Sequence, residues 1–206
     1  MKTVITISRQ YGSGGREIGK KLADQLGIPF YDNEIISRAA KDTGFSEAAF
    51  ESVEDKATNS LLYSIAMGMN VFTSQDTGFA GLSLDDRIFL AQSNVIRKVA
   101  EEGACVIVGR CADYILKDLD DIINVFISAD LDFRIQRSIE IDQLSPEHAA
   151  ETVSKKDKSR GNYYRYHAGE RWDNLFNYDL VLRSDRIGID KTVECIKNYV
   201  QSILKH

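Results

Sequence analysis

The chain has 206 residues, of which 43% are hydrophobic, and this is enough to bury the core of one α/β domain. Its formal net charge of −5 gives no global signal for a nucleic-acid or membrane partner. The longest apolar run, residues 61–72, is shorter than the roughly 20 residues that a membrane-spanning helix needs. No secretory pattern is visible at the start, and three cysteines without metal-ligand spacing are typical of a reducing compartment. We therefore expect a cytoplasmic protein.

Short apolar runs recur along the chain and are expected to form strands. They cover residues 4–8, 30–31, 105–108, 122–128 and 180–182. The runs are continuous rather than alternating, which is typical of strands that are buried on both faces of a parallel sheet.

Helical patterns separate these runs. A fourfold apolar spacing after the first strand stops at Gly27, and Ser83 is expected to cap a long helix that ends at Gly103. Ser145 precedes a proline at the first position of another helix, and a last apolar stripe begins near Asp190. Strands that alternate with such helices predict one doubly wound α/β domain, in which ligands bind beyond the carboxyl ends of the strands.

A glycine-rich loop follows the first strand and opens the first helix. It contains Gly12, Ser13, Gly14 and Gly15. Glycines let backbone N–H groups point at an anion, and a helix N-terminus adds about half a positive charge. This setting indicates a phosphate-binding loop, with a plain tight turn as the alternative.

The loop departs from the Walker A pattern G-x-x-x-x-G-K-[ST], whose lysine contacts the β- and γ-phosphates. Counted without a gap from the first strand, Arg9 stands at the leading glycine, Gly15 at the lysine and Arg16 at the hydroxyl residue. A shift by one residue makes Arg16 the substitute for lysine and Glu17 a magnesium ligand. Val108 occupies the place of the acidic residue that ends the third strand.

Two further features carry positive charge. Arg110 follows a buried strand and Gly109, so we expect it to project into the ligand crevice. Residues 155–171 contain six Lys/Arg against Asp157 and Glu170, and the motif at residues 161–164 predicts a hinge or break in this helix. The segment suits a lid over phosphates. A solvated basic face is the alternative, and stacking on nucleic acid is disfavoured by the overall acidity.

These motifs resemble the cytidylate kinase-like family, which is of the P-loop nucleoside monophosphate kinase type. The resemblance runs in order along nearly the whole chain. It is carried by the first strand with its loop and by residues 31–38, 106–110, 129–137, 155–165 and 178–182.

The resemblance implies a P-loop NTPase fold, with a three-layer α/β/α arrangement around a five-stranded, doubly wound parallel sheet. A helical acceptor-side insert is expected over about residues 32–103, and a helical lid over about residues 145–172. The implied reaction is phosphoryl transfer from ATP, with Mg²⁺, to a nucleoside monophosphate such as CMP or dCMP.

The same resemblance implies the site residues. Those for the donor phosphates are Gly12, Ser13, Gly14, Gly15, Arg16 and Glu17. Those for the acceptor are Asp32, Asn33, Arg38, Arg87, Arg110 and Asp157. The catalytic arginines are Arg16, Arg110, Arg160 and Arg165.

Several alternatives stay open at this stage. Arg38 could pair with Asp32 or Glu34, and Arg87 could be solvated. The altered Walker positions are compatible with a non-catalytic nucleotide-binding module. Cys111, where cytidylate kinases have an aspartate, is compatible with a kinase for another small molecule. Residues 61–69 are expected to be a helix that packs on the insert or makes a homodimer contact, and residues 73–82 a flexible loop.

Overall fold

A computed structural model describes residues 3–50 and 82–204 of the chain. Within these residues, five parallel strands form one sheet with the order β2-β3-β1-β4-β5. The strands are β1 (Val4–Arg9), β2 (Phe30–Tyr31), β3 (Cys105–Val108), β4 (Ile122–Ser128) and β5 (Leu180–Arg183). The expected doubly wound parallel sheet is confirmed, and the five predicted strands agree with the observed ones to within one residue.

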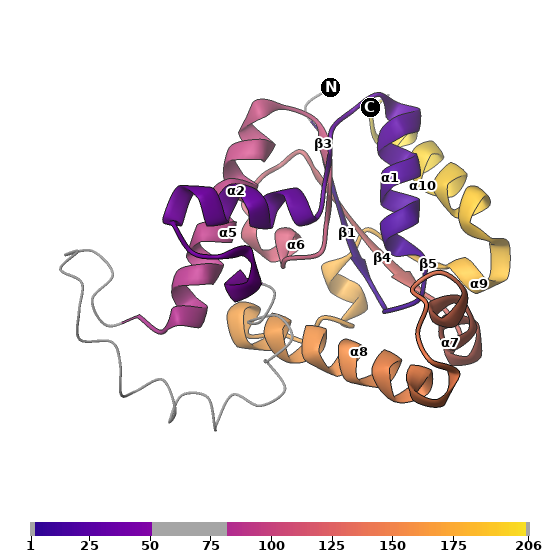
Figure 1. Cartoon of the computed structure of the whole chain (residues 1–206). Helices are drawn as coiled ribbons and strands as arrows, with labels where there is room; N and C mark the ends of the chain where they lie inside the picture. The colour runs from indigo at the N-terminus through magenta and orange to yellow at the C-terminus, as the bar shows by residue number, and fades with distance from the viewer. Residues whose placement is uncertain (1–2, 51–81, 205–206) are drawn as a thin grey trace.

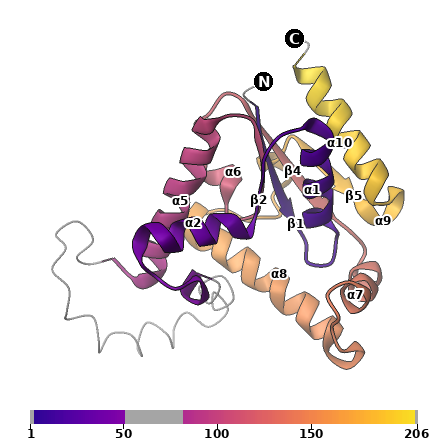
Figure 2. The same ribbon diagram turned by 45° about the horizontal axis from the view of Figure 1, so that its top comes forward.

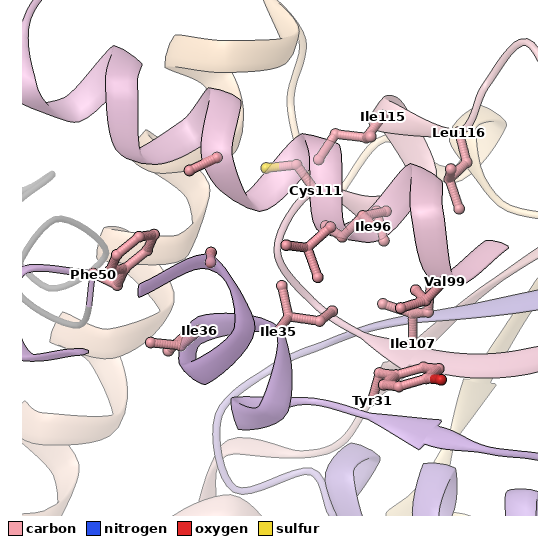
Figure 3. Packing of buried hydrophobic residues seen from close by; sticks show 14 of the residues in the cluster. Tyr31, Ile35, Ile36, Phe50, Ile96, Val99, Ile107, Cys111, Ile115 and Leu116 are labelled. Atoms are coloured by element: carbon pink, nitrogen blue, oxygen red, sulfur yellow. The ribbon is translucent and has the colours of Figure 1, made fainter. Parts of the chain in front are cut away.

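Helices cover both faces of the sheet (Figure 1). The helices are α1 (Gly15–Leu26), α2 (Asn33–Thr43), α5 (Leu84–Glu102), α6 (Ala112–Ile115), α7 (Leu131–Glu140), α8 (Pro146–Ala168), α9 (Ser184–Ile187) and α10 (Ile189–Ile203), with a 3₁₀ turn at Leu175–Asn177. One buried cluster joins the sheet to α1 and α10, and a second joins it to α2, α5 and α6. Figure 3 shows this second cluster, in which Ile35, Ile96 and Ile107 pack together.

The predicted helix ends are confirmed where a specific cap marks them. Ser83 accepts a hydrogen bond from the backbone N–H of Asp86 at 3.1 Å and precedes α5. Gly103 ends α5, and Gly27 ends α1 in a left-handed conformation. Pro146 is the first residue of α8, directly after Ser145.

The predicted hinge at residues 161–164 is wrong, because α8 continues without a break from Pro146 to Ala168. A Cβ atom at Gly161 would lie 2.9 Å from Nε1 of Trp172, so the glycine provides room for the indole ring. The neighbouring Tyr163 and Tyr164 are buried in the cluster that contains α2 and α5. This glycine therefore serves a packing contact within a continuous helix.

The long helix α8 lies across the carboxyl end of the sheet, where β1 and β4 point (Figure 1). Figure 2 shows the same relation from another direction, with α7 at one end of α8 and α2 and α5 near the other. The helix that was expected at residues 61–69 and the loop expected at residues 73–82 fall, apart from Leu82, outside the described residues. In the described part of the chain, no helix combines the length and apolarity that a membrane crossing requires.

Candidate active site

The glycine-rich loop connects the carboxyl end of β1 to the first turn of α1. Gly12 and Gly14 have φ angles of 75° and 80°, which side chains with a Cβ rarely adopt. Gly14 is the N-cap residue of α1, and no side chain there accepts a hydrogen bond from the first turn. Since the first N–H groups of a helix have no intrahelical acceptor, this turn presents hydrogen-bond donors toward the crevice.

The loop is packed closely against α7 and α10. A Cβ at Gly12 would lie 2.4 Å from the backbone oxygen of Arg134, and a Cβ at Gly14 would lie 2.4 Å from Cδ1 of Ile189. Ser13 is fully buried, and its carbonyl oxygen accepts a hydrogen bond of 2.6 Å from the hydroxyl of Ser184. The conformation of the loop is thus fixed by its neighbours.

An ion pair between α7 and α8 holds the other side of the loop. Arg134 donates from Nη1 to Oδ2 of Asp157 at 2.5 Å and to the carbonyl oxygen of Tyr11 at 3.3 Å. The second oxygen of Asp157 accepts from the backbone N–H of Tyr11 at 2.7 Å. The side chains of Arg134 and Asp157 are only 9% and 16% exposed. Asp157, predicted as an acceptor-site residue, therefore binds the phosphate loop itself.

Three arginines lie near the carboxyl ends of β1 and β3. Arg160 donates from Nη1 to the carbonyl oxygen of Arg9 at 3.1 Å, and its guanidinium lies 5.3 Å from the ring centre of Tyr11. The guanidinium of Arg9 lies against Gly109. Arg110 comes next in the chain and is 8% exposed. The structure thus brings the predicted residue Arg160 to Arg9 and Tyr11. It also places Arg9, to which the sequence patterns assign no role, against the turn that contains Arg110.

The two charged residues that open α1 both have partners. Arg16 donates from Nε to Oδ2 of Asp32 at 2.5 Å, and Asp32 is buried at the start of α2, next to the exposed Asn33. Glu17 pairs with Arg137 at 2.5 Å and with Lys21 at 3.2 Å. The carboxylate of Glu17 therefore lies between two cations.

The remaining predicted arginines lie apart from the loop. Arg38 pairs with Glu34 at 2.8 Å and with Glu102 at 3.7 Å, so it lies toward the beginning of β3 whereas Arg110 follows its end. Arg87 lies over the ring of Phe45 with 5.0 Å between the guanidinium carbon and the ring centre.

Arg165 is exposed on α8. It is five residues beyond Arg160, which places the two side chains about 140° apart around the helix axis. Arg160 faces the phosphate loop, and Arg165 faces another direction.

A buried polar contact joins α8 to the segment that follows Arg110. Asp113 is 4% exposed and accepts a hydrogen bond of 2.8 Å from the hydroxyl of Tyr164. Burial raises the pKa of the Asp113 carboxyl, and the Tyr164 hydroxyl opposes that rise. The contact spans 51 residues, so no local pattern could have indicated it.

Comparison with known proteins places the chain in a family of nucleotide kinases. The model of the cytidylate kinase-like family matches residues 4–186. A cytidylate kinase of Methanopyrus kandleri is 24% identical over 214 residues, which cover 100% of this chain and 96% of that protein.

Solved structures agree on the fold. An uncharacterised protein from Eubacterium ventriosum superposes with a TM-score of 0.70 and 27% identity, covering 97% of this chain and 99% of that one. A shikimate kinase from Bacteroides thetaiotaomicron has a TM-score of 0.54 and 12% identity, covering 97% and 98% of the two chains. The family match extends from β1 to α9 and includes the loop, the end of β3 and α8. The chain belongs to the cytidylate kinase-like family.

Proposed function

We propose that the protein transfers the γ-phosphoryl group of ATP to a nucleoside monophosphate, with CMP and dCMP as the first acceptors to test. The observation that carries this proposal is the closely packed glycine loop at the end of β1, with Arg160 bonded to the backbone of Arg9 and the buried Arg110 at the end of the neighbouring strand β3. The cytidylate kinase of Methanopyrus kandleri, which aligns over the whole chain, supports the choice of acceptor.

Phosphoryl transfer needs two anions brought together, their charge neutralised and water excluded. In this proposal the backbone N–H groups of Gly12 to Gly15 and the first turn of α1 bind the donor phosphates. Arg110 binds the acceptor phosphate. Arg160, fixed on α8 by its bond to the backbone of Arg9, stabilises the charge on the transferring group.

The acceptor nucleoside would contact the beginning of α2, at Asp32 and Asn33. Arg16 would hold Asp32 in place, and Arg38, Arg87 and Arg165 would contribute from the periphery by long-range attraction. No general base is needed, because a monophosphate acceptor is already an anion.

Residues 3–50 and 82–204 do not form a protein-held magnesium site. Arg16 stands where a Walker loop has its hydroxyl residue, and Val108 stands where the third strand usually ends in a carboxylate. Glu17 lies between the two cations Arg137 and Lys21. Among the described residues, no three histidine, cysteine or acidic side chains gather into a metal-binding group. Mg²⁺ usually keeps several waters and is bound through substrate phosphates as well as carboxylates, and the roles proposed for these residues include no ligand to it.

A second candidate function, a nucleotide-binding module without turnover, is favoured by the same replacements at Arg16 and Val108. A kinase for another small molecule is favoured by Cys111, which follows Arg110 in a left-handed conformation.

The test is ADP release from ATP and Mg²⁺ by the purified protein with CMP, dCMP, UMP, AMP or no acceptor. Release that depends on CMP or dCMP supports the proposal. Release with a different acceptor supports another kinase specificity. ATP binding without release in any reaction contradicts the proposal for these acceptors, and it supports the regulatory module or a kinase whose acceptor is outside the panel.

A further inference from the structure

The side chain of Arg9 lies between two glycines that are far apart in the sequence. A Cβ at Gly15 would lie 2.5 Å from Cβ and 2.9 Å from Cγ of Arg9. A Cβ at Gly109 would lie 2.0 Å from Nη1 and 2.9 Å from Cζ of the same arginine. The arginine stem therefore passes the first residue of α1, and its guanidinium lies on the turn that follows β3.

Gly15 has a helical backbone conformation, which residues with a side chain also adopt. The main chain therefore does not require a glycine at this position. What it provides is space, because any Cβ there would overlap the first two side-chain carbons of Arg9. These atoms lie next to the backbone and cannot move away as a side-chain end can. An arginine at position 9 thus requires a glycine at position 15.

The two positions are those that differ most from the Walker A pattern. In an ungapped count from β1, Arg9 takes the place of the first glycine and Gly15 the place of the lysine. Relative to the Walker pattern, the glycine and the cationic residue have therefore exchanged positions. The Arg9 side chain occupies the space beside residue 15 from which a Walker lysine would extend.

We propose that Arg9 supplies to the β- and γ-phosphates of the donor the positive charge that lysine supplies in Walker loops. This rests on the proposed function, since it names a donor-phosphate residue of the same site. Arg9 is the last residue of β1 and pairs in register with Ile127 of β4, so its main chain is part of the sheet. The guanidinium carries several donors in a fixed plane, which suits phosphate oxygens.

Arg16 is the competing candidate for the same role. Its side chain is 68% exposed, and its Nε atom binds the carboxylate of Asp32 at the start of α2. That contact directs the side chain toward the acceptor side. Arg9, in contrast, lies where β1 and β3 end, which is where ligands bind in parallel α/β sheets.

The first experiment measures binding of ATP with Mg²⁺, and of inorganic tripolyphosphate, by titration calorimetry on the full chain. Arg9→Gln is expected to weaken both ligands by about tenfold or more, because charge-assisted hydrogen bonds to phosphate are lost. Lys20→Gln is the matched control, since Lys20 is an exposed cation on α1, and it is expected to bind like the wild type.

Arg16→Gln is expected to weaken tripolyphosphate less than Arg9→Gln does. Thermal midpoints confirm that each variant is folded. Folded Arg9→Gln that binds both ligands like Lys20→Gln overturns the proposal, as does a larger loss in Arg16→Gln.

The second experiment tests the exchange itself with Arg9→Gly, Gly15→Lys and the double variant. Arg9→Gly removes the cation, and Gly15→Lys forces a lysine against the arginine stem, so each single variant is expected to lose affinity. The double variant restores the Walker arrangement and is expected to bind ATP to within about threefold of the wild type. A folded double variant that binds no better than Arg9→Gly contradicts the exchange.

Failure of the proposed function would look different. If no acceptor supports ADP release but Arg9→Gln still weakens ATP, the role of Arg9 stands and the transfer reaction does not. If CMP-dependent release occurs and Arg9→Gln changes neither binding nor release, the reaction stands and the role of Arg9 does not.

Discussion

Arg110 and Cys111 have φ angles of 61° and 53°, a left-handed conformation that costs residues with a Cβ about 1–2 kcal/mol each. Together with Gly109, at 74°, they form a left-handed turn between β3 and α6. Such backbone conformations cluster at functional sites, where the surrounding structure holds them in place. The turn holds the buried Arg110 directly after the carboxyl end of β3, which is consistent with a role in binding phosphate.

Replacing Arg110 by alanine tests that role without changing the backbone requirement, because alanine also has a Cβ. Arg110→Ala is expected to weaken CMP by more than about tenfold through the loss of charge-assisted hydrogen bonds. Calorimetric titration with CMP measures the effect. Arg97→Ala, an exposed arginine on α5, is the control. Equal CMP affinity in the two variants would remove Arg110 from the acceptor site.

The ion pair of Arg134 and Asp157 makes a second prediction at this scale. Asp157→Ala leaves the buried charge of Arg134 without its carboxylate, and breaking a buried pair in this way costs about 3–5 kcal/mol. Urea unfolding is expected to show a loss near that range. Asp24→Ala breaks the exposed pair with Lys20, where side chains are 56% and 59% exposed, and is expected to cost less than about 1 kcal/mol. Similar losses in both variants would contradict this assignment.

At the scale of the elements, α8 connects the two halves of the site. Near its middle, Asp157 and Arg160 contact the phosphate loop. One turn further on, Tyr163 and Tyr164 donate hydrogen bonds to Gln92 of α5 and Asp113 of α6. A helix that is bonded at both places fixes the position of the glycine loop relative to α5 and α6.

Gly161 lies between these two groups of contacts. Replacing it tests whether the glycine serves the contact with Trp172 within a continuous helix. Helix propensity alone predicts that Gly161→Ala stabilises the protein by about 1 kcal/mol. We expect the opposite, a lower thermal midpoint, because the new methyl group would overlap Nε1 of Trp172 at 2.9 Å.

Trp172 is the only tryptophan in the sequence, so its fluorescence reports the displacement directly. Ser154→Ala, at an exposed position of the same helix, is the control and is expected to change the midpoint little. A raised midpoint in Gly161→Ala with unchanged fluorescence would be the contrary result.

The elements also show which parts of the structure the sequence could predict. Strands and most helix ends follow from continuous apolar runs and from residues such as Ser83 and Gly103, whose effect is local. The predicted hinge at residues 161–164 is wrong, because Gly161 gives a local signal for a helix break but in the structure makes room for the distant indole of Trp172.

The candidate site also contains features that the local sequence predicts and contacts that it does not. The glycine loop and Arg110 follow directly from adjacent residues. The bond of Asp157 to Tyr11 spans 146 residues and has no local signal. For Arg9 a signal does exist in the sequence, since the ungapped count puts Arg9 at the leading glycine of the Walker pattern and Gly15 at its lysine.

At the scale of the whole molecule, stability is expected to depend on pH through His167. Its ring is stacked on Phe89 with 3.8 Å between ring centres and contacts Tyr163 and Tyr166. Burial lowers the pKa of His167 to about 4 from 6.5, although the charge of Asp86 opposes that shift. Between these two values the unfolded chain binds a proton that the folded chain does not, so unfolding free energy rises with pH.

His167→Phe keeps the stacked ring and removes the titration. Urea unfolding from pH 4 to 7 is expected to show a smaller rise in stability with pH for this variant than for the wild type. The raised pKa of Asp113 acts with the opposite sign in both proteins and cancels in the comparison. Parallel profiles would show that His167 is protonated equally in the folded and unfolded states.

The overlap of the Arg9 side chain with any Cβ at position 15, and of its guanidinium with a Cβ at position 109, has a consequence for the history of the fold. A lineage that moves between this loop and a Walker loop by single substitutions has two possible intermediates. One has arginine at position 9 and lysine at position 15, whose side chains overlap. The other has glycine at both positions and lacks the cation. If Arg9 has the proposed role, both intermediates are expected to bind the donor weakly, and the exchange is expected to be hard to reverse. Across relatives, positions 9, 15 and 109 are expected to vary together, although ninety-four residues separate the last two in the sequence.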